Sequence, residues 1–106
     1  MPDKSKVRQP EGVWTFLSNH AHVLICIAAD SETRMRDIAD RIGVTERAVQ
    51  RIISELEEGG YVKITREGRR NRYSVDANKP MRHPLTRHRM LSHLIEFGLG
   101  GKPKKK

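Results

Sequence analysis

Arginine, glutamine and threonine side chains recur in the stretch TERAVQRIIS, residues 45–54. Arg47, Gln50 and Arg51 are three and four positions apart, so on a helix they share one face. A guanidinium group can donate two parallel hydrogen bonds, and a primary amide can donate one while accepting another. On B-DNA the matching partners are guanine O6 with N7 and adenine N6 with N7. The chemistry that this spacing predicts is hydrogen bonding to base edges.

The apolar residues of the same stretch predict the helix that would present this face. They recur at intervals of three and four, which is typical of a helix with one buried stripe: Ala48, Val49, Ile52, Ile53 and Leu56. The outer face then carries Glu46, Arg47, Gln50, Arg51 and Ser54. We expect Thr45 to be the N-cap, and Gly59 and Gly60 to end the helix. The alternative is a polar face that is merely solvated.

Another helix is expected over residues 36–42, and the residues GVT separate it from the helix that follows Thr45. Gly43 stands where the chain must turn with positive φ, which glycine adopts most cheaply. Ala39 is small enough to let the two helices approach closely, and Val49 follows the glycine after six positions. A small residue, a glycine and an apolar residue at these intervals indicate a helix-turn-helix. Arg36, at the start of this second helix, is a candidate phosphate contact.

After Gly60 the period of the apolar residues changes from 3.6 to 2. YVKIT (residues 61–65) and NRYSV (residues 71–75) alternate, and Gly68 lies between them, which predicts a β-hairpin. Five basic residues against Glu67 make residues 63–72 strongly positive. At the expected tip we place Arg69, Arg70 and Asn71, with Arg72 beside them, as backbone or minor-groove contacts. The alternative is an edge hairpin kept soluble by charge.

Two stretches together resemble a winged helix-turn-helix transcriptional regulator of bacterial or archaeal type, close in character to MarR and ArsR repressors. They are RDIADRIGVTERAVQRIISELEEGGYV and REGRRNRYSV. The resemblance covers residues 18–75. It implies that the helix after Thr45 enters the DNA major groove. The hairpin, which is called the wing in this family, then contacts the backbone or minor groove. It also implies a homodimer joined through terminal helices.

The remaining elements complete the expected fold, which is mostly α-helical with a small β-hairpin wing. We predict a first helix after SN at residues 18–19, a very short strand at residues 33–35 and a last helix near residues 85–97. The expected organisation is a flexible arm at residues 1–12, a winged helix-turn-helix domain at 13–78, a C-terminal helix for dimerisation at 79–100 and a basic tail at 101–106. The last helix could instead fold back onto its own domain.

The charge balance favours a polyanionic partner. The chain of 106 residues has a formal net charge of +8, and the four lysines of the tail supply half of it. Cys26 is the only cysteine, which excludes an intrachain disulfide and suits a reducing compartment. The longest apolar run, VLICIAA, is too short to cross a bilayer, which takes about 20 residues. We therefore expect a cytoplasmic protein without a membrane partner.

Catalytic and metal sites are not expected. The chain has no glycine-rich phosphate loop, no HExxH sequence and no nucleophile elbow. His22 and Cys26 are one helical turn apart, yet a sensing site usually needs three or four ligands. We accordingly predict no enzyme activity, no cofactor and no metal.

The sequence as a whole predicts a homodimeric regulator that binds specific double-stranded DNA. The expected contacts are Arg36, Thr45, Arg47, Gln50, Arg51, Ser54, Arg69, Arg70, Asn71 and Arg72. Two alternatives stay open: a winged helix that binds protein, and a protein that binds nucleic acid without sequence preference.

Overall fold

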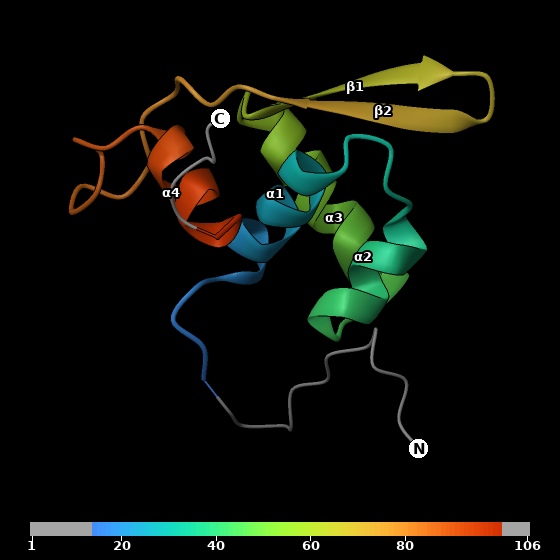
Figure 1. Cartoon of the computed structure of the whole chain (residues 1–106), viewed down its shortest axis with the longest axis horizontal. Helices are drawn as coiled ribbons and strands as arrows, with labels where there is room; N and C mark the ends of the chain where they lie inside the picture. Colours follow the sequence, from blue (N-terminus) through green and yellow to red (C-terminus); the bar gives the residue numbers. More distant parts are fainter. Residues whose placement is uncertain (1–13, 101–106) are drawn as a thin grey trace.

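The computed structural model describes residues 14–100, which form four helices and one hairpin (Figure 1). In chain order the elements are α1 (Asn19–Ala29), α2 (Met35–Ile42), α3 (Glu46–Glu58), β1 (Val62–Glu67), β2 (Arg70–Val75) and α4 (Leu91–Gly98). The predicted class, mostly helical with a small β-hairpin, is confirmed. The expected arm at residues 1–12 and basic tail at 101–106 lie outside the described residues.

The helix ends follow the predicted local chemistry. The Ser18 hydroxyl accepts a hydrogen bond from the Ala21 amide at 3.2 Å, so α1 begins with a side-chain cap. The Thr45 hydroxyl accepts one from the Ala48 amide at 3.0 Å and caps α3 in the same way. Gly43 ends α2 in the left-handed region, with φ 80° and ψ 34°. All three were expected from the sequence.

The short strand predicted at residues 33–35 does not form. Met35 is already the first residue of α2, which removes it from the extended conformation that a strand requires. A single backbone hydrogen bond, from the Tyr73 amide to the Ser31 carbonyl at 2.8 Å, joins this stretch to β2. Residues 31–34 therefore lie against the hairpin without forming a ladder with it.

The core is apolar and draws on all four helices. The largest completely buried side chains are Val23, Ile27, Ile38, Val49, Ile52 and Ile53. Tyr61 and Tyr73 close the core from the hairpin side, and both are buried. The Tyr61 hydroxyl donates a 3.3 Å hydrogen bond to the Pro80 carbonyl, so this phenol is satisfied although its ring is buried.

The last helix begins later than predicted, at Leu91 rather than residue 85. The residues before it are held in turns, because the Leu91 amide donates to the Lys79 carbonyl at 2.8 Å and the Met81 amide to Arg89 at 3.0 Å. Leu91 and Ile95 are buried in the common core. α4 thus packs on α1 of its own chain. No helix among residues 14–100 is long and apolar enough to span a membrane.

Candidate nucleic-acid interface

The exposed face of α3 carries the predicted reading residues. Val49, Ile52, Ile53 and Leu56 are buried against the core, and this orientation turns the opposite side of the helix outward. The exposed side chains on that side are Arg47, Gln50, Arg51 and Ser54. Ala48, expected in the buried stripe, is half-buried at its edge. The predicted outer face therefore exists, and Thr45 stands at its N-terminal end.

α2 supports this helix from behind. Ile38 is completely buried, and Ala39 is 4% exposed. The Ala39 carbonyl accepts hydrogen bonds from the amides of Gly43 and Val44, at 2.9 and 3.1 Å, which closes the turn between the helices. Because the turn is short and its carbonyl is satisfied twice, the start of α3 is fixed relative to α2.

The two arginines of the α3 face have different surroundings. Arg51 Nη1 lies 3.4 Å from Glu55 Oε2, and Glu55 Oε1 lies 2.7 Å from His20 Nε2 on α1. The hydrogen bond with His20 lowers the pKa of the Glu55 carboxyl, burial opposes that shift, and the Arg51 charge lowers it further. Arg47, one turn earlier, makes no ion pair with any residue in 14–100. Arg47 is therefore available for a base contact, whereas Arg51 must first leave Glu55.

The wing has a tighter turn than the sequence suggested. β1 and β2 pair antiparallel from Val62↔Val75 to Glu67↔Arg70, so only Gly68 and Arg69 remain in the turn. Gly68 has φ 64°, which allows this two-residue connection. The prediction that Arg70 and Asn71 belong to the tip is wrong, because both are residues of β2. Arg69 alone of the three lies at the tip.

Arg70, Asn71 and Arg72 also make intramolecular contacts that the sequence did not reveal. Arg70 Nη2 donates to the Glu32 carbonyl at 2.9 Å, and Arg72 Nη2 lies 2.6 Å from Glu32 Oε2. Arg72 Nε lies 3.2 Å from Glu67 Oε2 within the hairpin. Asn71 donates to the Tyr73 hydroxyl at 3.4 Å. Arg70 and Arg72 hold the wing against the loop before α2, in addition to any contact with a partner.

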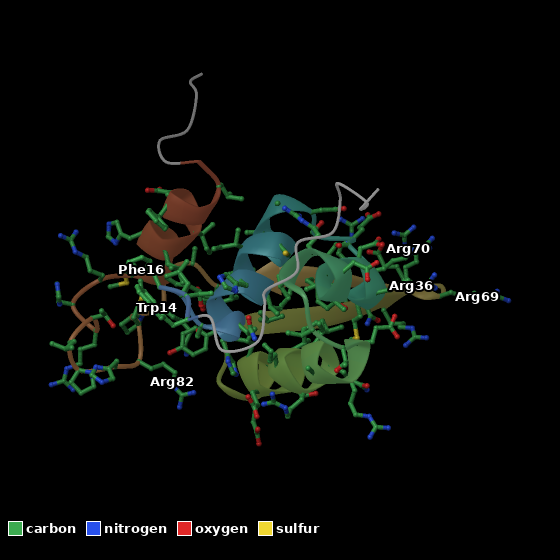
Figure 2. The ribbon with its side chains drawn as sticks, turned by 90° about the horizontal axis from the view of Figure 1, so that it is seen from below. Trp14, Phe16, Arg36, Arg69, Arg70 and Arg82 are labelled. Atoms are coloured by element: carbon green, nitrogen blue, oxygen red, sulfur yellow. The ribbon has the colours of Figure 1, made fainter. Side chains whose placement is uncertain are left out.

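A basic hollow of about 350 Å³ lies between the wing and the start of α2. Four arginines line it: Arg34, Arg66, Arg69 and Arg70. Figure 2 shows Arg69 and Arg70 at the same end of the molecule as Arg36, which is 71% exposed at its side chain and 3.9 Å from Glu46. Arg34 and Arg66 were not among the predicted contacts, because no periodicity relates residues on two separate elements. This hollow has the charge and position to hold a phosphate group.

His22 and Cys26 of α1 belong to no group of three potential metal ligands within residues 14–100. His22 Nδ1 is hydrogen-bonded to Asn19 Oδ1 at 3.1 Å, and Cys26, one turn later on the same helix, is buried. Burial raises the pKa of the Cys26 thiol, while the nearby Arg41 charge lowers it. Within residues 14–100, no group of three His, Cys, Asp or Glu side chains could hold a metal ion.

Comparison with known families agrees with this arrangement. Residues 19–63 match the model of the winged helix-turn-helix DNA-binding family. The matched span contains α1, α2, the turn, α3 and the start of β1, and the structure adds the rest of the wing. The four helices and the hairpin accordingly have the layout of a winged helix-turn-helix domain, and residues 19–63 are similar to the DNA-binding family of that name. No curated protein and no solved structure gives a significant match to the chain.

Proposed function

We propose that this protein is a transcriptional regulator that binds specific double-stranded DNA sequences. The observation that carries the proposal is the exposed row of Arg47, Gln50 and Arg51 on α3, next to a wing lined with arginines. α3 lies in the major groove, where bidentate donors can distinguish all four base pairs. The wing follows the sugar-phosphate backbone or enters the adjacent minor groove.

The contacts divide into two groups with different roles. Arg47, Gln50 and Arg51 read bases, and Thr45 and Ser54 contact bases or nearby phosphates at the two ends of the same face. The remaining predicted contacts, Arg36, Arg69, Arg70, Asn71 and Arg72, position the domain on the backbone. Phosphate contacts of this kind fix register but carry no sequence information.

The assembly belongs to the same proposal. Exposed apolar side chains lie on both sides of residues 18–75, the span that resembles a winged helix-turn-helix: Trp14, Phe16, Phe97 and Leu99 are 73%, 91%, 69% and 50% exposed. Burying them between two copies would explain their exposure. A two-fold dimer, as in MarR- and ArsR-type proteins, reads an inverted repeat with half-sites about one helical turn apart. We further propose a cytoplasmic protein without enzymatic activity.

A protein-binding module is the second candidate. Its specific support is the Trp14–Phe16 pair, whose ring centres are 4.8 Å apart in an edge-on arrangement on the surface. Exposed aromatic residues are common anchors in protein interfaces. In this case the α3 face would remain in solvent, and DNA binding would be weak at every sequence.

In vitro selection of duplexes from random DNA distinguishes these functions. The proposal expects one enriched site, and a palindromic site would also support the dimer. Retained duplexes without a common sequence would indicate binding through charge alone. No retained duplex at about 50 mM salt, where charge-driven binding is strong, would contradict DNA binding and favour the protein-binding module.

A further inference from the structure

A second basic surface lies at the opposite end of the molecule from the wing. From Lys79 to Met90 the chain has four lysines or arginines and two histidines, but no aspartate or glutamate. We call residues 79–90 the basic loop. Figure 1 shows it in orange, extending beside α4 and away from the hairpin. The DNA contacts proposed above lie on α2, α3 and the wing, so they do not account for this charge.

The basic loop is closed and ordered by its own backbone. Its neck is held by the hydrogen bond from the Leu91 amide to the Lys79 carbonyl and by the bridge between Pro80 and Met90. Inside the loop, the Thr86 amide donates to His83 at 2.9 Å and the Arg89 amide donates to Thr86 at the same distance. Since these bonds fix the backbone in advance, ordering it on binding costs little entropy.

The arginines of the basic loop are available for an anion. Arg82, Arg87 and Arg89 are exposed, and none of them makes an ion pair with another residue between 14 and 100. Arg72 on the wing, by contrast, already has two carboxylates within 3.2 Å. The three arginines of the basic loop therefore have fewer ionic contacts within the fold than Arg72 has.

The placement of the basic loop relates it to α3 and the wing. In Figure 2, Arg82 and Arg69 lie at opposite ends of the long direction, and α3 runs along the lower side between them. The molecule measures 42 Å in its longest dimension. One turn of B-DNA is about 34 Å. A duplex lying across α3 would therefore bring phosphates close to both ends.

We propose that the basic loop binds the sugar-phosphate backbone of DNA on the flank of α3 opposite to the wing. Arg82, Arg87 and Arg89 are the contacts. The acids Glu57 and Glu58 at the end of α3 repel phosphates, so the basic loop supplies the cations that this side of the helix lacks. The inference rests on the proposed DNA-binding function and adds a second anchor to it.

Hydroxyl-radical footprinting of the full chain on a duplex of about 40 base pairs tests the proposal, using a site from the selection. Wild type should protect the backbone on both flanks of the major groove that α3 occupies. The loop variant R82A/R87A/R89A should lose protection on one flank, and the wing variant R66A/R69A should lose it on the other. The charge-preserving variant R82K/R87K/R89K should keep both. Thermal melts of each variant verify folding.

The salt dependence of binding gives a second measurement. Log K falls with log salt, and each phosphate contact contributes roughly 0.9 to the steepness of that fall. The variant R82A/R87A/R89A should therefore make the slope less steep by about 2 to 3. The single variant Arg87→Gln should make the slope less steep by about 1. This single variant replaces the triple variant in the experiment if the triple variant unfolds. A bound wild type with a loop variant of unchanged footprint and slope would overturn this inference alone. A loop effect on duplex RNA but not on DNA would also overturn it, and a wild type that binds no duplex would overturn both proposals.

Discussion

Arg72 and Glu32 form an ion pair of 2.6 Å between Nη2 and Oε2, although they are 40 residues apart in the chain. The carbonyl of the same Glu32 accepts a hydrogen bond from Arg70. One residue in the loop before α2 therefore holds two arginines of β2. Through these contacts the wing is oriented relative to the helix-turn-helix.

Replacing Glu32 should loosen the wing without unfolding the domain. Both side chains of the ion pair are nearly half exposed, so Glu32→Gln should lower the free energy of unfolding by less than about 1 kcal/mol. Amide hydrogen exchange in β1 and β2 should become several-fold faster. Glu67→Gln is the matched control, because it removes the carboxylate within the hairpin and keeps the link to the loop. Equal exchange in both variants would show that Glu32 does not hold the wing.

The N-cap of α3 should contribute measurably to stability. Thr45→Ala removes the hydroxyl that accepts the Ala48 amide and should cost about 1 kcal/mol in urea unfolding. Thr45→Ser keeps the acceptor and should lie within a few tenths of wild type. If alanine and serine are equally stable, the hydrogen bond seen at 3.0 Å does not stabilise the helix.

Gly98 should be required where α4 meets α1. A Cβ at this position would clash with Cδ1 and Cγ1 of Ile25. Alanine usually stabilises a helix relative to glycine by up to about 1 kcal/mol. Here we expect Gly98→Ala to destabilise instead, by about 1 to 3 kcal/mol, because α4 must move off Ile25.

The double variant Ile25→Ala with Gly98→Ala tests the cause of that loss. If the contact is responsible, Gly98→Ala should cost much less once Ile25 is truncated, and a thermodynamic cycle would show coupling. A Gly98→Ala protein more stable than wild type would contradict the packing of α4 on α1.

Local features of this fold could be predicted from the sequence, and long-range ones could not. The caps at Ser18 and Thr45, the left-handed Gly43 and the buried stripe of α3 each depend on neighbours within one or two turns. Such features follow from side-chain chemistry and spacing alone. The exposed face of α3 was predictable for the same reason.

Two errors are local, namely the strand at residues 33–35 and the length of the hairpin turn. The others concern contacts between distant segments. The basic loop closes through backbone bonds between Lys79 and Leu91, so α4 starts later than its apolar pattern indicated. The engagement of Arg70 and Arg72 by Glu32 depends on how β2 lies beside the loop before α2. A run of basic residues in a sequence does not reveal which of them the fold uses internally.

The His20–Glu55 contact predicts an effect of acid on stability. The folded-state pKa of Glu55 lies below its ordinary value of 4.5, chiefly because of the hydrogen bond with His20. The unfolded chain therefore binds a proton at Glu55 more readily than the folded chain does. The ionised Glu55 stabilises the folded state above pH 4.5, and this stabilisation is lost as pH falls from about 4.5 through the lowered pKa.

Carboxyl NMR titration of Glu55 measures this contribution directly. His20→Ala should move the pKa of Glu55 back toward its ordinary value, and should flatten the pH dependence of unfolding below about 4.5. His22→Ala is the control, because His22 bonds Asn19 and not Glu55. A Glu55 titration that is the same in all three proteins would contradict the contact.

Base reading by the exposed face of α3 is the basis of the proposed function. Its most direct test is the affinity of wild type, Arg47→Ala and Gln50→Ala for the selected site and for every single-base-pair change in it, measured by anisotropy at fixed salt. We expect each variant to lose discrimination at one or two base-pair positions, by about 1 to 3 kcal/mol, and to keep it elsewhere. Uniform weakening at every sequence, or no change, would contradict reading by this face.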